Sequence, residues 1–395
     1  MKVNCDRNKT EVICFNTSEG DINLIPQSFK LGNKDIYRVS ETKVLGLIID
    51  EDLMYKAHCQ EVIKSLQGRW ASICKYSSKY WGFNVSVMMY LIKALFISKM
   101  SYASHIWMTK ENLSDLNSFW YHILKSVIGA ELNISHNIAQ IILGIPPINI
   151  QTQVNSIKHF LKIINKPVQN DVYKEFLCDT YNSTTKSPRN LHIKLKDTFS
   201  FLQWKINLYP THFNQNDIMI VNGNQINNLF KLSEKAGSYS QTMMKHYTEK
   251  VLWAPSIRNQ FQLDGYHTSP NPCCDLIPIP PGTPRKSEVQ LLSLLYKNNL
   301  LNQSLYNIGR RPSPVCRFCN QDEETAEHLL FNCRSVDQQH KTTARSTYRL
   351  ALQLNDDEPE PTFYIGCLNA IRNSEFVKSC LTIVTLLDFE VTVDL

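Results

Sequence analysis

The chain has 395 residues, with 42 lysines and arginines against 36 acidic residues and a formal net charge of +6 at pH 7. Its composition, 43% hydrophobic and 20% charged, is that of a globular protein with room for about two or three domains, which excludes a disordered chain. The first residues contain no apolar run of the kind a secretion signal needs. We therefore expect a nuclear or cytoplasmic protein that is not secreted and whose cysteines are reduced.

The first 50 residues have the pattern of short strands and turns. Residues 11–15 form a β-rich run, and residues 28–31 and 36–39 flank a Gly32-Asn33 turn signal, which predicts a hairpin. Residues 43–50 are apolar enough to predict one further, buried strand.

The spacing of the apolar residues then changes to steps of three and four, which predicts amphipathic helices. The predicted helices cover residues 63–74, 85–103, 113–129, 135–144 and 150–165, with a break at residues 80–84. Their aromatic and methionine side chains are predicted to form a core. The longest apolar stretch, residues 85–107, is interrupted by Lys93 and Lys99, so an amphipathic helix is predicted there and not a membrane span.

Basic residues are concentrated in the first two of these helices. Between Lys56 and Lys110 there are eight lysines and arginines and a single acid, Glu61. Such a surface favours a polyanion such as nucleic acid, although an ordinary solvated helix face explains the same charges without a partner. The candidate contacts are Lys64, Arg69, Lys75 and Lys79.

Residues 166–285 show little periodicity, and six prolines between Pro270 and Pro284 predict a linker at their end. Cys273-Cys274 with His267 is a poor metal site, because adjacent thiols rarely reach one metal ion. After the linker, helices are predicted over residues 287–302, 336–353 and about 374–388, the last two separated by an acidic, proline-containing break at residues 356–361. The predicted division is 1–50, 51–165, 166–285 and 286–395.

A four-ligand motif lies between the first two of these C-terminal helices. Cys316 and Cys319 are three residues apart, and His328 and Cys333 follow, a spacing that suits a structural, tetrahedral zinc ion. The acids of residues 322–327 are predicted in the first turn of a short helix, where the helix dipole favours them, with His328 and Cys333 on that helix and at its end. The alternative is a set of unrelated buried cysteines in a chain that has 12.

Taken together, these segments resemble the C-terminal part of a reverse transcriptase from a jockey-like non-LTR retrotransposon. The resemblance covers roughly residues 1–165 and 276–340 and is carried by five stretches in the family's order: Asn8-Lys9-Thr10 with residues 11–15, residues 39–50, residues 81–107, residues 143–147, and residues 285–314 with the four zinc ligands. The chain departs from the family at Val44, where an aromatic residue is usual, and at Ala103, where glycine is frequent. The Cys-to-His gap is also longer than in the retroviral zinc knuckle.

This resemblance implies an α+β, predominantly α-helical fold. It contains the end of a polymerase palm with a short β-hairpin, a helical thumb, a connector and a small helical domain with a zinc knuckle. Polymerases of this family hold two Mg²⁺ ions on an Asp-Asp turn a few tens of residues before the position of Lys9, which here follows only eight residues. Asp356-Asp357 and Asp50-Glu51-Asp52 lie in the wrong context for that turn. Mg²⁺ is therefore expected only in an intact polymerase, and this chain alone is expected to be inactive as an RNA-directed DNA polymerase.

The leading hypothesis is a truncated reverse transcriptase that binds RNA and DNA, namely a template–primer duplex, through its thumb and knuckle. The resemblance adds Arg317, Phe318 and Arg334 of the knuckle as contacts, with Phe318 either stacking on a base or packing beside the metal. Two alternatives remain open. One is an intracellular zinc-containing helical protein that acts in protein–protein assembly, and the other is an active enzyme with metal carboxylates in an unrecognised arrangement.

Overall fold

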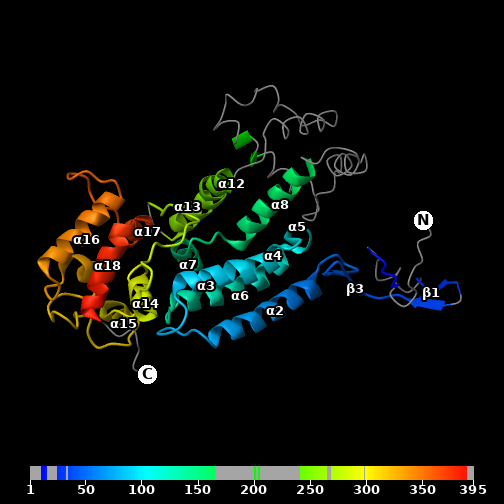
Figure 1. Cartoon of the computed structure of the whole chain (residues 1–395), viewed down its shortest axis with the longest axis horizontal. Helices are drawn as coiled ribbons and strands as arrows, with labels where there is room; N and C mark the ends of the chain where they lie inside the picture. Colours follow the sequence, from blue (N-terminus) through cyan, green and yellow to red (C-terminus); the bar gives the residue numbers. More distant parts are fainter. Residues whose placement is uncertain are drawn as a thin grey trace.

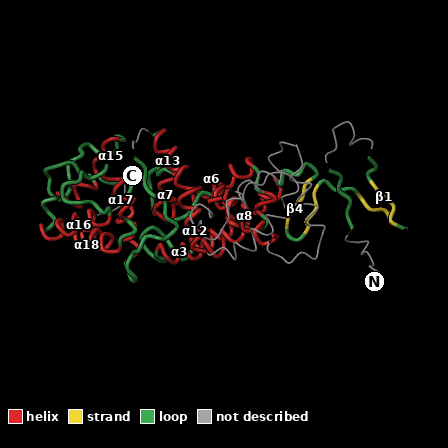
Figure 2. The backbone as a smooth tube through the Cα atoms, turned by 90° about the horizontal axis from the view of Figure 1, so that it is seen from above, coloured by secondary structure: helices red, strands yellow, loops and turns green. Residues whose placement is uncertain are grey.

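The computed structural model describes residues 10–15, 25–32, 34–164, 200–201, 203–204, 241–264, 268–297 and 299–388. Strands lie at one end of an elongated molecule, the helices from α2 to α8 form its middle, and the C-terminal helices form the other end (Figures 1 and 2). The predicted fold class, mostly helical with small two-stranded sheets, is confirmed. Lys9, His267 and most of residues 166–240 lie outside the described residues.

The described strands form two separate antiparallel hairpins. β1 (Ser28–Leu31) pairs with β2 (Lys34–Tyr37), as predicted, and β3 (Glu41–Val44) pairs with β4 (Leu47–Asp50). The single strand predicted over residues 43–50 is therefore wrong. Leu45 and Gly46 both have positive φ angles, 49° and 84°, which makes them a tight two-residue turn that reverses the chain between Val44 and Leu47. In residues 11–15, Val12 alone forms a bridge, to Arg38.

The middle of the molecule is helical, and the predicted helices of this region are confirmed. The elements are α2 (Lys56–Cys74), α3 (Val85–Ile92), the π-helix η1 (Lys93–Ile97), α4 (Ser98–Ser101), α5 (Ser104–Trp107), α6 (Lys110–Ile128), α7 (His136–Leu143) and α8 (Ile148–Ile164). Asn84 caps α3 and Thr109 caps α6 through side-chain oxygens, each accepting from a backbone N–H three residues on. Gly129 and Gly144 end α6 and α7 in the left-handed conformation.

The core of this helical region consists of side chains that the sequence predicts to be buried. The predicted methionine and aromatic core is confirmed by buried Met88, Met89, Met100, Trp107 and Trp120. Among the described residues, no helix combines the length and the apolar character that crossing a bilayer requires.

The C-terminal half is helical too. Its elements are α12 (Gln241–Tyr247), the π-helix η5 (Thr248–Trp253), α13 (Ala254–Leu263), α14 (Arg285–Ser293), α15 (Asn302–Asn307), the π-helix η6 (His328–Asn332), α16 (Gln338–Ala351), α17 (Phe363–Ala370) and α18 (Ser374–Leu387). The helices predicted near 336–353 and 374–388 are confirmed. The single helix predicted over residues 287–302 is wrong, because α14 ends at Ser293 and α15 begins only at Asn302. The side chain of Asn299, which accepts from Leu301 N, stabilises the turn between them.

The proline-rich stretch before α14 is packed against helices on both sides of it in the sequence. Its Cys274 N–H donates to Glu249 of η5 at 2.6 Å, and its Asn271 N–H donates to Asn369 of α17 at 2.7 Å. Arg372, which follows α17, donates to the carbonyl oxygens of Ile141, Ile142 and Cys273. The C-terminal end of α7 and the proline-rich stretch are thus held by one arginine, while the division of the chain into domains stays a prediction.

Gly144 provides a test of this packing. Its φ angle is +63°, and a Cβ built on it would lie 2.1 Å from the Asp275 carbonyl oxygen, which is backbone and cannot rotate away. We expect Gly144→Ala to lower the free energy of unfolding by about 1–3 kcal/mol. The matched control is Gly68→Ala in the middle of α2, where nothing lies within 4 Å; it should raise stability by up to about 1 kcal/mol. Urea denaturation of both variants measures this, and equal stabilities would contradict the packing described.

Candidate metal centre and basic surface

The metal centre begins with a small hairpin that carries two of the four ligands. Val315 and Glu323 form an antiparallel bridge, and Cys316 N–H donates to the Asp322 carbonyl at 2.8 Å. The chain turns within the hairpin, where Asn320 N–H donates to the Cys316 carbonyl at 2.9 Å and Asn320 adopts a φ of 54°. This turn brings the side chain of Cys319 back toward that of Cys316.

A short helical segment supplies the other two ligands. Thr325 caps its start, since its hydroxyl accepts from His328 N–H at 2.9 Å. His328 is the first residue of η6, and Cys333 follows its end, with Cys333 N–H donating to the His328 carbonyl at 2.7 Å. The predicted position of His328 and Cys333 on a helix and at its end is confirmed. The predicted position of the acids is wrong for Asp322, Glu323 and Glu324, which precede the helix as parts of the hairpin and its exit.

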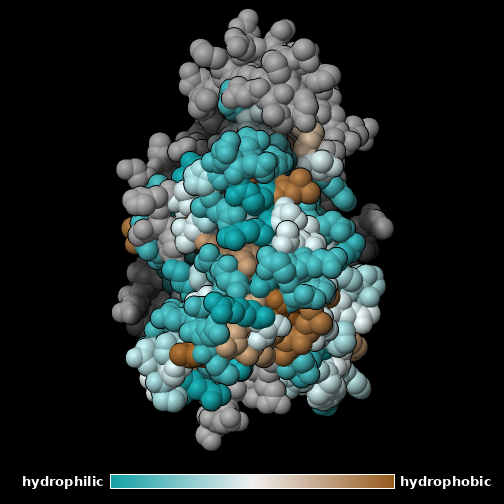
Figure 3. Space-filling model, turned by 90° about the vertical axis from the view of Figure 1, so that its left-hand side faces the viewer, coloured by the Kyte–Doolittle hydropathy of each residue, from teal (hydrophilic) through white to brown (hydrophobic). Residues whose placement is uncertain are grey.

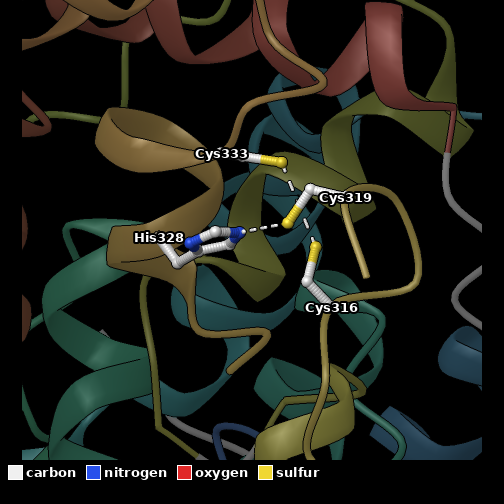
Figure 4. Close-up of side chains that lie close together, drawn as sticks. All are labelled: Cys316, Cys319, His328 and Cys333. Atoms are coloured by element: carbon white, nitrogen blue, oxygen red, sulfur yellow. Dashed lines mark hydrogen bonds between the residues drawn. The ribbon is translucent and has the colours of Figure 1, made fainter. Parts of the chain in front are cut away.

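The four side chains converge on one point (Figure 4). Their ligand atoms all lie within 4.8 Å of one another, with Cys316 Sγ 4.0 Å from Cys333 Sγ and Cys319 Sγ 3.3 Å from His328 Nε2. A tetrahedral zinc ion with its usual bond lengths needs about 3.8 Å between two sulfurs and about 3.5 Å between sulfur and nitrogen. Because the observed separations are close to these values and Cys316, His328 and Cys333 are buried, the donor set fits zinc.

The thiols differ in acidity. Burial raises the pKa of Cys316 to about 12 and also raises the pKa of Cys333. At Cys319 burial acts in the same direction, but hydrogen bonds from the backbone of Asp322 and Gln321, and from the Cys316 and His328 side chains, outweigh it and lower the pKa to about 6. A zinc ion would hold all three sulfurs as thiolates, which is the form that metal binding requires.

Charged residues around the cluster orient its ligands. The carboxylate of Asp322 lies 3.8 Å from His328 Nδ1, on the ring edge away from the cluster, the place where a carboxylate orients a zinc-bound histidine. Glu324 is fully buried and accepts from the Arg317 backbone N–H and side chain and from Asn302 N–H. The bond from Asn302 N–H joins this carboxylate, and with it the ligand hairpin, to the start of α15. The sequence does not predict that Glu324 is buried, because the consecutive acids Asp322, Glu323 and Glu324 look alike in it.

The three predicted nucleic-acid contacts of the knuckle have different surroundings. Arg317 is bound to Glu324 and to the Leu300 carbonyl. Phe318 is half-buried and packs against the hydrophobic core, and Arg334 is exposed beside Cys333. Contact of these residues with nucleic acid stays a prediction.

The four predicted contacts of the helical region also differ. Lys64 is exposed on α2 and Lys75 at its C-terminal cap, and Arg69 donates from Nη1 to the Leu95 carbonyl. Lys79 forms an ion pair with Glu131, and burial lowers its pKa against the opposing effect of that carboxylate. The structure thus places Lys64 and Lys75 on one exposed side of α2, while Arg69 is turned toward η1 and Lys79 toward Glu131, which follows α6.

The end of the molecule that carries the C-terminal helices is largely hydrophilic, with a few small hydrophobic areas (Figure 3).

Within the described residues, one group of histidine, cysteine or acidic side chains could hold a metal ion, namely Cys316, Cys319, His328 and Cys333. Cys273 and Cys274 are not part of such a group among the described residues, and His267 lies outside them, so the poor metal site stays a prediction.

Over 135 residues the chain is 26% identical to the Retrovirus-related Pol polyprotein from type-1 retrotransposable element R1 4 of Nasonia vitripennis. The match covers 34% of this chain and 34% of that protein, so the chain spans about a third of the length of the relative it matches. No family model and no solved structure matches the chain. The chain therefore combines a distant, partial similarity to an R1 non-LTR retrotransposon Pol polyprotein with a Cys3His cluster that suits zinc.

Proposed function

We propose that the chain binds nucleic acid as part of a non-LTR retrotransposon reverse transcriptase. In this proposal residues 1–50 are the end of the palm, residues 51–165 the thumb, residues 166–285 a connector and residues 286–395 the zinc-knuckle domain. The partner is an RNA or DNA template–primer duplex. The task of this chain is binding, and no nucleotidyl transfer is assigned to it.

The observation that carries the proposal is the exposed face of α2 that bears Lys64 and Lys75, where the one acid of the helix, Glu61, is paired with Lys43. Lys64 and Lys75 are eleven residues apart, which puts them on the same side of the helix and about 17 Å apart along its axis. No aspartate or glutamate occurs between Glu61 and Glu111, so no acid from α2, α3, η1, α4 or α5 beyond Glu61 competes for these charges. Two exposed cations on one helical face are suited to phosphates of a duplex, in contacts that do not depend on sequence.

The zinc module supports the same function in a different way. A zinc ion would fix the hairpin and η6 around it, so that the exposed Arg334, next to the ligand Cys333, is presented on a rigid loop. Arg317 is engaged with Glu324 and holds this module together, and we propose that Arg334 contributes more to phosphate binding than Arg317.

The salt dependence of duplex binding tests the α2 face. The logarithm of the binding constant should fall linearly with the logarithm of salt concentration, and Lys64→Ala or Lys75→Ala should each reduce the slope by about 0.9. The control is Lys378→Ala in α18, which removes the same charge from an exposed lysine paired with Glu375. Fluorescence anisotropy with a labelled duplex measures these slopes. Slopes in the two α2 variants that equal the wild-type slope would count against this surface.

A zinc-containing protein without salt-dependent affinity for nucleic acid would favour the other hypothesis, a helical module for protein–protein assembly. Measuring zinc content and duplex binding on the same preparation separates the nucleic-acid-binding hypothesis from the protein–protein assembly hypothesis.

A further inference from the structure

The loop between α2 and α3 is a small hairpin, residues 76–83, which we name the aromatic hairpin. Ser77 and Gly82 form an antiparallel bridge, and Ser78 N–H donates to the Trp81 carbonyl at 2.8 Å. Gly82 has a φ of +94°, and a Cβ at this position would lie 2.3 Å from the Tyr76 carbonyl oxygen, so the hairpin can close only on a glycine. The loop is therefore a built structure with a defined conformation.

Three aromatic rings share one face of this hairpin. Cross-strand partners in an antiparallel pair lie on the same face and successive residues on opposite faces, so Tyr76, Phe83 and Trp81 lie opposite to Ser77 and Gly82. The ring centroids of Tyr76 and Phe83 are 6.4 Å apart, which agrees with this arrangement. Ser77 is buried, and the aromatic face is the one directed away from it.

The rings of Tyr76 and Trp81 are open to solvent. Tyr76 is 66% exposed and Trp81 is 58% exposed, whereas Trp70, Trp107, Trp120 and Trp253 are 8% exposed or less. Burial of an apolar ring stabilises a protein, so a tryptophan and a tyrosine that are both exposed on one face of a loop leave this free energy unrealised. Such a pair is a good candidate for a surface that a partner covers.

Charge indicates which partner. Lys75 directly precedes Tyr76 and is exposed, and Tyr90 and Lys93 are exposed on the following helical segment. The hairpin itself contains no acid, and Glu131, the acid that reaches it, is paired with Lys79. Aromatic faces combined with cations are suited to a ligand that offers both planar rings and negative charge. The bases of a duplex are stacked on one another, whereas a single strand leaves its bases free to stack on protein side chains.

We propose that the aromatic hairpin binds a single strand of nucleic acid, with Tyr76 and Trp81 stacking on its bases and Lys75 contacting its backbone. This inference rests on the proposed function, because it adds a single-strand site at the C-terminal end of the helix, α2, that carries the duplex-binding lysines. The strand would be the unpaired part of a template that continues beyond the duplex.

The experiment uses the full chain, a labelled oligothymidylate and a labelled blunt duplex. Trp81→Ala and Tyr76→Ala should each weaken oligothymidylate binding about tenfold, because stacking on one ring is lost, without a change in the salt dependence. Duplex affinity should change by less than about twofold in these variants, since the α2 lysines are intact. Trp81→Phe keeps an aromatic face and should retain most of the affinity. Tyr306→Ala, at an exposed tyrosine of α15, is the matched control.

The outcomes separate the two proposals. If the wild-type chain binds duplex with the expected salt dependence but Trp81→Ala and Tyr76→Ala bind oligothymidylate as well as wild type does, the single-strand site is wrong and the duplex surface stands. If the wild-type chain binds neither nucleic acid, both are wrong. Quenching of tryptophan emission by unlabelled oligothymidylate, absent in Trp81→Phe, would add direct support for contact at this ring.

Discussion

Cys316→Ser is expected to release zinc and to unfold the segment from the ligand hairpin to the end of η6. A structural zinc ion contributes on the order of 10 kcal/mol to the folding of its module. Here the loss would leave Cys333 and His328 buried without the ion that they surround. Because Leu329, Leu330 and Phe331 of the same segment are buried in the core, the effect should extend to the packing of α16.

Metal analysis and hydrogen exchange measure this outcome. The wild-type chain should contain about one zinc ion per molecule, as a single four-ligand site requires. Cys316→Ser, or treatment with a chelator, should remove it and expose the amides of residues 313–336 to exchange. Cys74→Ser is the control, because Cys74 is an exposed cysteine on α2 outside the cluster. Wild-type protein that contains no zinc, or that keeps its protection in chelator, would contradict the assignment.

Glu288→Ala is expected to lower the free energy of unfolding by about 3–5 kcal/mol. Glu288 and Arg285 of α14 are both 2% exposed and form an ion pair of 3.5 Å. Glu288 also accepts from Val85 N–H at the start of α3, and Arg285 donates to the Val127 carbonyl near the end of α6 at 2.6 Å. Removing the carboxylate leaves a buried guanidinium without its counter-charge and a buried N–H without an acceptor.

The ion pair between Lys286 of α14, the residue after Arg285, and Asp388 at the end of α18 serves as the matched control. Lys286 and Asp388 are 2.8 Å apart, with side chains 38% and 69% exposed, so Lys286→Ala should cost less than about 1 kcal/mol. Denaturant titration of both variants gives the comparison. A Glu288→Ala variant no less stable than Lys286→Ala would show that burial of the Arg285 pair is not what holds α14 against α3 and α6.

The sequence predicted those features that depend on local spacing. The helices of the middle region were found because their apolar residues recur every three or four positions, and the zinc ligands because they lie close together in the chain. α17 was missed because its residues, Phe-Tyr-Ile-Gly-Cys-Leu-Asn-Ala, are apolar on almost every side and show no helical period. The sequence does not predict α12, η5 and α13. These helices lie within residues 166–285, where the apolar residues show little periodicity.

Contacts between distant residues could not be predicted in this way. The sequence predicts Lys79 as a phosphate contact, but it does not show the partner Glu131, which is 52 residues away in the chain. It predicts Val44 and Leu47 in one strand, because nothing in an apolar run shows that Leu45 adopts a positive φ. The role of Glu324 likewise depends on which of three acids points inward, and this is decided by the fold of the hairpin.

Two arginines, Arg285, which is buried, and Arg372, which is half-buried, have a consequence for how the polypeptide is held together. Arg285 and Arg372 bind carbonyl oxygens near the ends of α6 and α7, that is, of helices more than 150 residues earlier in the chain. Both acceptors lie before the long stretch of residues 165–199 and 205–240, and both donors lie after it. The C-terminal helices are therefore anchored to α6 and α7 through space, by guanidinium groups that bind carbonyl oxygens at helix ends. These hydrogen bonds tie the C-terminal helices directly to the ends of α6 and α7.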